Sequence, residues 1–449
     1  MTQTILTTAL TVTQTMDGND QYLVTATGSV ITANSQAFSI TGDNNDVYID
    51  GLVATTSFTS IRISGLDSSV VISQNGQVYQ TQNGDSSAAL SFGTLAGNST
   101  MTNHGQITGT SGLSFESSVG GNVYLNYGTV TSLGTETDFA SGILFYLGDG
   151  TFYNYGIVSA RQNGIYVRDN MIDNVVINEG SITGDQGILL ELGSSLSFTN
   201  AGTLTALSGI AVLDTGAGSE YNNSGEINGD IDAVAVSGLT QITNSGVIDG
   251  DVLLGTGADT YLGRADGVVT GEINGGAGDD RLVGGANVDT MYGGDDIDSM
   301  RGRDGDDDLN GGDGRDDIRG QGGDDYIAGD GDSDTLMGGR GDDEIDGGAG
   351  NDTITGGRGN DILTGGTGRD VFVFNRATGD DEITDFLNNI DRIDLSAYGL
   401  TSRQDLTDAG AIIANGSGSI IDLTLIGGDG VIYVEDMTVA QWSNHDFVF

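Results

Sequence analysis

Eleven aspartates recur at nine-residue intervals between positions 275 and 373, and no other residues of this chain are better arranged to do chemistry. Each takes the sixth place of an unbroken nine-residue unit that reads approximately G-G-x-G-x-D-x-U-x, where U is a large apolar residue. The eleven are Asp280, Asp289, Asp298, Asp307, Asp316, Asp325, Asp334, Asp343, Asp352, Asp361 and Asp370. Carboxylate and carbonyl oxygens are hard ligands, which favour Ca²⁺ over a transition metal. The spacing therefore predicts a series of calcium sites.

The apolar residue at the eighth place of each unit predicts the element that holds the aspartates. It is Leu282, Met291, Met300, Leu309, Ile318, Ile327, Leu336, Ile345, Ile354, Leu363 or Phe372. A short strand with one inward side chain explains this constancy, whereas a flexible linker needs no such period. Two units then make one coil of a flattened spiral, with coils ~4.8 Å apart. The aspartates divide into a stack of six and a stack of five, whose five and four gaps hold at most nine ions.

Glycine at the first, second and fourth places of the unit permits a tight turn with its carbonyls pointing inward. Arg303, Gln321 and Asp330 replace the second glycine in three early units, so we expect the units from Gly338 onward to be the best formed. The glycines expected to offer ligands there are Gly339, Gly341, Gly348, Gly350, Gly357 and Gly359.

These 99 residues resemble the repeats-in-toxin, or hemolysin-type calcium-binding, nonapeptide. The resemblance implies a parallel β-roll with Ca²⁺ between successive turns. It also implies export from a Gram-negative cell by the type I secretion machinery, directed by an uncleaved C-terminal signal. The final residues Asp446-Phe447-Val448-Phe449, an acid followed by three apolar residues, are similar to the ends of such substrates; an ordinary last strand is the alternative, and both can be true.

The composition favours an extracellular protein that folds with metal. The formal net charge is −49, so repulsion expands the chain until counter-ions bind, and metal binding is linked to folding. The chain contains no Cys and no Pro, and all fifteen of its basic residues are Arg. The acidic balance argues against nucleic-acid binding, and we expect neither a membrane span nor a Sec signal.

A second repeat, N-x-G followed one residue later by Ile, Val or Leu, marks the N-terminal half. It begins at Asn103, Asn126, Asn154, Asn178, Asn200, Asn223 and Asn244, at intervals of 21 to 28 residues. Period-two alternation between the marks predicts short strands and therefore a right-handed parallel β-helix. We expect each Asn to adopt a left-handed or turn conformation and to stack its amide on the next coil. Similar coils occur in bacterial adhesins and other surface proteins, which is a resemblance of architecture.

The sequence thus predicts an all-β protein in three parts. Residues 1–255 form the β-helix, 256–373 the β-roll with its repeats at 275–373, and 374–449 a β-rich cap that carries the secretion signal. In the cap, Asp381, Asp385 and Asp391 could hold one more ion or lie on a solvated surface, and Trp442 is expected to pack against the cap.

An enzyme acting on polysaccharide is the alternative function, because parallel β-helices host lyases, epimerases and hydrolases. The available carboxylates form no recognisable motif: Asp138, Asp149, Asp173, Asp185 and Glu191. A cluster of aromatic and basic residues is either a sugar-binding patch or an outward stack: Tyr153, Tyr155, Arg161, Tyr166 and Arg168. We favour a secreted calcium-dependent structural or adhesive protein without a catalytic site, which associates end to end into a surface layer or filament. A cell-surface polysaccharide is a candidate partner.

Overall fold

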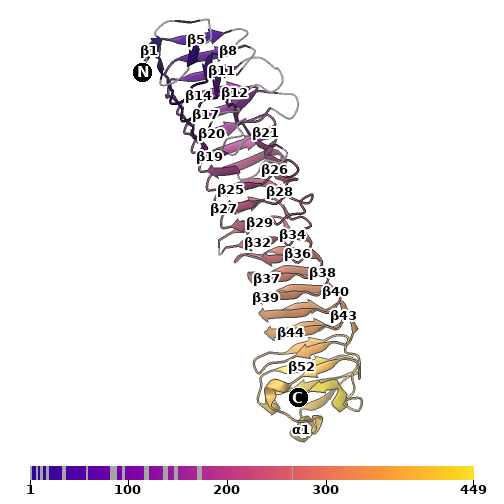
Figure 1. Cartoon of the computed structure of the whole chain (residues 1–449). Helices are drawn as coiled ribbons and strands as arrows, with labels where there is room; N and C mark the ends of the chain where they lie inside the picture. The colour runs from indigo at the N-terminus through magenta and orange to yellow at the C-terminus, as the bar shows by residue number, and fades with distance from the viewer. Residues whose placement is uncertain are drawn as a thin grey trace. The chain divides into compact units, whose positions relative to one another are not determined.

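The structure is a computed structural model that carries no ligands. It describes the chain apart from residues 1–2, 7–8, 11–13, 17–19, 33–36, 57–58, 81–87, 94–96, 116–120, 135–139, 146–149, 169–173 and 265, and it describes side chains from residue 20 onward, Phe92 excepted. Two compact units divide the chain: Met1–Ile242 with Gly246–Asp251, and Thr243–Ser245 with Val252–Phe449. Each is a parallel β-solenoid, so the predicted all-β class is confirmed (Figure 1).

The first unit coils through three walls of parallel strands. The first wall contains β1 (Gln3–Leu6), β4 (Gln21–Val24), β7 (Asp46–Ile49), β10 (Ser69–Ile72), β13 (Thr100–Asn103), β16 (Asn122–Asn126), β19 (Gly150–Asn154), β22 (Asn174–Asn178), β25 (Leu196–Asn200) and β27 (Glu220–Asn223), and β29 (Gln241–Asn244) follows. The second contains β2 (Ala9–Leu10), β5 (Ser29–Thr32), β8 (Leu52–Thr55), β11 (Gln77–Gln80), β14 (Gln106–Gly109), β17 (Thr129–Ser132), β20 (Ile157–Ser159), β23 (Ser181–Gly184), β26 (Thr203–Asp214), β28 (Glu226–Asp232) and β30 (Val247–Asp249). The third contains β3 (Gln14–Met16), β6 (Phe38–Ile40), β9 (Ile61–Ile63), β12 (Ala88–Phe92), β15 (Ser111–Phe115), β18 (Ile143–Phe145), β21 (Asn163–Val167) and β24 (Gln186–Leu190), which pairs with the end of β26.

The second unit has two walls of parallel strands, as expected for a roll with two repeats per coil. One contains β32 (Thr260–Gly263), β35 (Arg281–Val283), β37 (Ser299–Asp304), β39 (Asp317–Gly322), β41 (Thr335–Arg340), β44 (Thr353–Arg358), β47 (Val371–Val373), β49 (Arg392–Asp394) and β53 (Phe447–Val448). The other contains β31 (Val252–Leu253), β34 (Glu272–Ala277), β36 (Thr290–Asp295), β38 (Asp308–Asp313), β40 (Tyr326–Gly331), β42 (Glu344–Asp346), β43 (Ala349–Gly350), β45 (Ile362–Thr364), β46 (Thr367–Gly368), β48 (Asp381–Ile383) and β52 (Val431–Val434), and the short β33 (Val268–Val269) precedes β34.

An antiparallel sheet and short helices close the second unit at its C-terminal end. The sheet joins β50 (Ile412–Asn415) and β51 (Gly418–Asp422) to β52. The helices are α1 (Arg403–Ala409), η1 (Ser396–Tyr398), η2 (Leu423–Ile426) and η3 (Asn444–Asp446). Trp442 packs in this cap as predicted, with its ring centroid 5.3 Å from that of Phe386 and 5.1 Å from that of Phe447. Among the described residues, the seven-residue α1 is the only α-helix, and no helix there could span a membrane.

One apolar side chain per strand fills the interior of the roll. All eleven residues at the eighth place of the repeat are fully buried, as the period predicts. In the first unit, aromatic rings on adjacent coils stack inside the core, with centroids 4.7 Å apart for Phe115 and Phe145 and 5.1 Å apart for Tyr124 and Phe152. Regular coil spacing therefore brings like side chains into contact along the solenoid.

Six of the seven marked asparagines, from Asn103 to Asn223, form a continuous buried ladder at one corner of the coil. The side-chain amide of Asn103 donates to the amide oxygen of Asn126 at 2.8 Å, and Asn126 donates to Asn154 at 2.8 Å. The chain continues at 2.7–2.9 Å through Asn178 and Asn200 to Asn223. Each Asn ends an extended strand, and none has a positive φ, so the expected left-handed conformation is wrong while the expected stacking of amides is confirmed.

The glycine of the N-x-G repeat is required by packing rather than by a left-handed backbone. A Cβ placed on Gly156 would lie 2.1 Å from the carbonyl oxygen of Gly128, and one on Gly180 would lie 2.1 Å from that of Gly156. The coils approach each other too closely at this corner for any side chain. In the N-x-G motif, the Asn therefore forms an uncharged ladder, and the Gly leaves room for the carbonyl of the adjacent coil.

Replacing Asn178 with Ala should destabilise the first unit by about 1–3 kcal/mol, because it leaves buried amide groups on the adjacent coils without partners. Hydrogen exchange of peptides from β19 to β25 should accelerate accordingly. Asn222→Ala, which removes a hydrogen bond to Glu220 on the surface, is the matched control and should change little. Equal effects of the two substitutions would contradict the structural role of the ladder.

Candidate metal centre

The repeat aspartates stack directly above one another at the start of each strand and are 0–3% exposed. In every gap between repeats, the backbone N–H of one Asp donates to Oδ1 of the Asp eighteen residues later. Five such bonds join the stack that begins at Asp280, at 2.7–2.9 Å, and four join the stack that begins at Asp289, at 2.8–3.0 Å. The alternation into two stacks is as predicted.

The second carboxylate oxygen of these aspartates is left without a hydrogen-bond donor. Oδ2 is buried and unpartnered in ten of the eleven, the exception being Asp289. A buried carboxylate oxygen without a partner is costly, because it has lost its hydration and gained nothing in return. The stacks therefore present a line of negative oxygens that a cation would satisfy.

Burial raises the pKa of these carboxyl groups, and the negative charge of nearby aspartates raises it further. The pKa reaches about 8 for Asp298, Asp307 and Asp343, and about 6 for Asp352 and Asp361. The backbone N–H received at Oδ1 lowers the pKa, and it only partly offsets burial. Without a cation, the folded roll disfavours the charged form that a metal ligand must adopt.

The glycines of the turn supply carbonyl oxygens close to these carboxylates. Gly339, Gly341, Gly357 and Gly359 have φ of 119–134°, which is the left-handed region. A Cβ placed on Gly359 would lie 1.9 Å from the carbonyl oxygen of Gly341, so the carbonyl of one turn points at the next. Gly348 and Gly350 also have positive φ, and a Cβ on them would meet the carbonyl oxygens of Asp330 and Asp332.

The first glycine of the unit makes room for the unpartnered oxygen. A Cβ on Gly356 would lie 2.1 Å from Oδ2 of Asp361, and one on Gly338 would lie 2.1 Å from Oδ2 of Asp343. In the described part of the chain, no three acidic or histidine side chains converge on one point. A cation between turns would thus take carbonyl oxygens in addition to carboxylates, which is a donor set suited to Ca²⁺.

The turns that lack the second glycine keep the same conformation. Arg303, Gln321 and Asp330 have φ of 91°, 86° and 67°, and the strand register continues through them. Side chains with a Cβ adopt this region at a cost, so neighbouring coils must hold them there. The substitutions that we expected to weaken the early units therefore leave the turn geometry intact.

Two aspartates that follow the tandem repeats extend the two stacks. Asp381 accepts the N–H of Asp361 at 3.1 Å, and Asp391 accepts that of Asp370 at 3.0 Å, both through Oδ1. Both are 1% exposed, so the solvated surface that was one alternative for them is wrong. Asp385 instead accepts the N–H groups of Gly365 and Gly366.

Sequence reasoning missed the residue that begins the first stack. Asp259 donates its N–H to Oδ1 of Asp280 at 2.6 Å and is 1% exposed. The segment Gly255-Thr-Gly-Ala-Asp259-Thr-Tyr261 carries the glycines, the Asp and the apolar residue of the repeat. It lies 21 residues before Asp280 instead of 18, so it does not fit the nine-residue period of the other aspartates.

The residues considered for polysaccharide chemistry do not form one site. Asp138, Asp149 and Asp173 lie outside the described residues, Asp185 is exposed, and Glu191 accepts a hydrogen bond from the Tyr166 hydroxyl. Tyr166 is buried, whereas Tyr155 is exposed and stacks on Tyr127 with centroids 4.9 Å apart. The aromatic cluster therefore divides between the core and an outer corner, where His104 also stacks on Tyr127.

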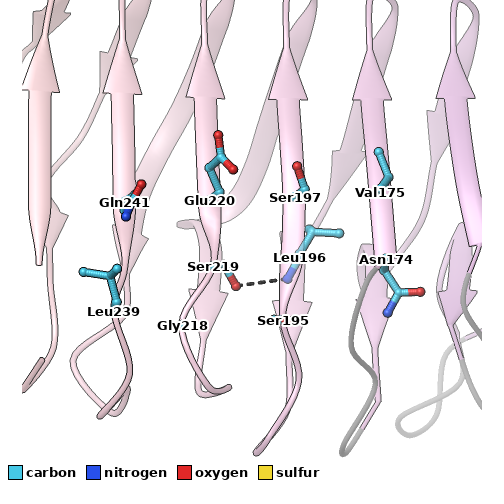
Figure 2. A pocket seen from close by; sticks show the side chains of 10 residues that line it. All are labelled: Asn174, Val175, Ser195, Leu196, Ser197, Gly218, Ser219, Glu220, Leu239 and Gln241. Carbon is cyan, nitrogen blue, oxygen red and sulfur yellow. Dashed lines mark hydrogen bonds between the residues drawn. The ribbon is translucent and has the colours of Figure 1, made fainter.

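A surface hollow of about 430 Å³ lies on the first wall of the first unit, across β22, β25, β27 and β29. Figure 2 shows Ser197, Glu220 and Gln241 side by side on successive strands. Glu220 is the only carboxylate among the described residues that line it. These described residues thus offer one carboxyl group, whereas glycoside hydrolysis uses a pair.

Comparison with known proteins agrees with the geometry of the second unit. The model of the RTX calcium-binding nonapeptide repeat (4 copies) matches residues 272–300, 301–336 and 337–372. No curated protein matches the chain. The chain therefore carries RTX calcium-binding repeats on a parallel β-solenoid, as the resemblance of its nonapeptides implies.

Metal-free protein should become less stable as the pH rises from about 4 to 8. The pKa of the repeat aspartates is raised from 3.8 to as much as about 8, so the folded roll holds more protons than the unfolded chain in this range. Calcium should reverse the trend, because it binds the deprotonated form. Circular dichroism with chelator should show the roll's strands at pH 4.5 and their loss at pH 8, and the calcium midpoint should rise as the pH falls. A metal-free signal that grows with pH would be incompatible with these shifts.

Proposed function

We propose that this protein is an extracellular, calcium-dependent structural or adhesive protein whose roll folds when Ca²⁺ binds after export. The supporting observation is the row of ten buried carboxylate oxygens without partners. Such a row is tolerable only when protonated or bound by cations, and extracellular calcium modules typically bind at roughly 10⁻⁴–10⁻³ M. The chain would stay loose in a calcium-poor cytosol and fold outside the cell.

The proposed ligands are the repeat aspartates together with turn carbonyls such as those of Gly339, Gly341, Gly357 and Gly359. One ion would lie between successive turns of each stack, which gives a ceiling of nine within the tandem repeats. Each ion would neutralise the carboxylates above and below it, so binding of one ion orders the turn that the next ion needs. Folding should therefore be steep in calcium concentration.

Export through a type I channel follows from this proposal. A protein that folds only in calcium can pass through a narrow channel before it folds. The terminal residues, which we propose to belong to the secretion signal, pair through β53 with β49 in the folded cap. The signal would then be extended during export and ordered afterwards.

Self-association is proposed for the first unit. In this chain, each of β1, β2 and β3 pairs on one side, with β4, β5 and β6, within the described residues. A strand of a second copy could pair beside them. The cap of the second unit, by contrast, covers the final coil of the roll with antiparallel strands. The hollow lined by Ser197, Glu220 and Gln241 offers hydroxyl, carboxylate and amide groups suited to a cell-surface glycan.

Asp343→Asn should raise the calcium concentration needed to fold the roll by at least the roughly tenfold that loss of even a supporting group costs a metal site. The substitution keeps the size of the side chain and removes its charge. Calcium titration followed by circular dichroism measures the midpoint. Glu344→Gln, on the exposed neighbouring position, is the matched control for charge and should leave the midpoint nearly unchanged. A roll that ignores both chelator and Asp343→Asn would refute calcium-dependent folding.

Electron microscopy and light scattering of the protein in millimolar calcium should show assemblies whose size grows with concentration. Filaments or layers indicate heterologous contacts that do not close, and dimers indicate association through one end only. The same samples in chelator should be smaller. A monomer over the whole concentration range would contradict self-association.

A further inference from the structure

The first turn of the Asp289 stack differs from the other ten turns of the tandem repeat. At the second place of the unit, ten residues have positive φ, including the three that are not glycine. Gly285 is the exception, because its backbone does not adopt the left-handed region. Its N–H instead donates to Oδ2 of Asp289 at 2.7 Å. The only repeat aspartate whose Oδ2 has a hydrogen-bond donor is thus in the only turn whose second residue lacks a positive φ.

Arg303, from the following coil of this stack, reaches back over that turn. Its Nη1 donates to the carbonyl oxygen of Gly284 at 3.0 Å and to that of Gly263 at 2.6 Å. These carbonyls belong to the first place of the unit and to its counterpart one coil earlier. The guanidinium also acts to lower the pKa of Asp289, against the larger effect of burial, which raises it. A positive charge therefore already lies among the oxygens of the first turn.

The residues of this turn do not fit a calcium ion. The carboxylate oxygen that is free in the other ten turns is used by Gly285, and the Gly284 carbonyl is used by Arg303. The chain keeps Arg303 at φ 91°, a conformation that disfavours a side chain with a Cβ. Glycine would relieve that strain, so the guanidinium has to offset it by the contacts it makes.

We infer that the guanidinium of Arg303 replaces a calcium ion at the head of the Asp289 stack, which makes the first coil of that stack independent of metal. The inference rests on the proposed function of the remaining turns. It lowers the ceiling from nine ions to eight, because one of the nine gaps is closed by the side chain. The first coil would then be folded in the absence of calcium, and its strands would offer an edge on which the later coils fold as ions bind.

Hydrogen exchange in chelator tests this inference on the full chain. In the natural protein, peptides from β35 and β36 should be protected in chelator, and more strongly than peptides from β41 and β42, which belong to later repeats. Arg303→Gly should accelerate exchange in β35–β36 about tenfold, as expected for the loss of a charge-assisted hydrogen bond. Calcium should restore protection in the variant, and calorimetric titration should count one more ion than in the natural protein.

Gln321→Gly is the matched control, because it relieves a positive φ at the same place of the next turn in the stack and removes no positive charge. It should leave both the ion count and the exchange of β35–β36 unchanged. Arg303→Met keeps the apolar part of the side chain and guards against a general packing defect. Protection of β35–β36 in chelator that survives in both Arg303 variants would overturn the inference.

The two proposals fail in different ways. A natural protein that binds no calcium would end the proposed function. Calcium binding with equal ion counts for the natural protein and Arg303→Gly, together with unchanged exchange, would end only the inference about Arg303.

Discussion

The structure of the second unit depends on the burial of like-charged carboxylates at the spacing of one coil. Each repeat Asp donates its N–H to the carboxylate of the next coil, and this bond fixes the register of the turn. The bond satisfies one oxygen and leaves the other buried without a donor. The geometry that aligns the coils is thus also the geometry that makes the metal-free roll unfavourable, and the two cannot be separated. In the function proposed above, calcium would supply the missing interaction, and a coil spacing of ~4.8 Å suits an ion between oxygens.

The first unit solves the same stacking problem with neutral groups. An asparagine amide has both a donor and an acceptor, so the ladder from Asn103 to Asn223 can satisfy itself from coil to coil. A carboxylate has acceptors only, so a stack of aspartates depends on backbone N–H donors. Each N–H pairs with one carboxylate oxygen, and the second oxygen of ten of the eleven has no donor. The choice of Asn or Asp at the corner of a coil therefore decides whether the stacked side chains satisfy one another's hydrogen bonds or leave oxygens that a cation could bind.

Periodic features of both solenoids were predictable from sequence because each is enforced at every coil. The buried residue at the eighth place, the two aspartate stacks and the asparagine ladder all repeat, and the structure confirms them. Features that depend on a departure from the repeat at one coil, or on a contact between adjacent coils, were not predictable. Asp259 was not recognised because its coil has three extra residues, and the sequence does not show that a carbonyl one coil away leaves no room for a side chain at the N-x-G glycine. Tyr166 was placed with outward aromatics, although all five residues of its strand are buried.

Three of the four ends of the aspartate stacks share a hydrogen bond that the middle lacks. Asp259, Asp289 and Asp391 each accept, at Oδ2, the N–H of the residue four positions earlier. A turn at the end of a stack has a neighbouring turn on one side only, so its carboxylate faces one gap instead of two. A local backbone donor removes the unpartnered charge where no complete site can form. The chain thus confines the unpartnered oxygens of the repeat aspartates to positions with a turn on both sides.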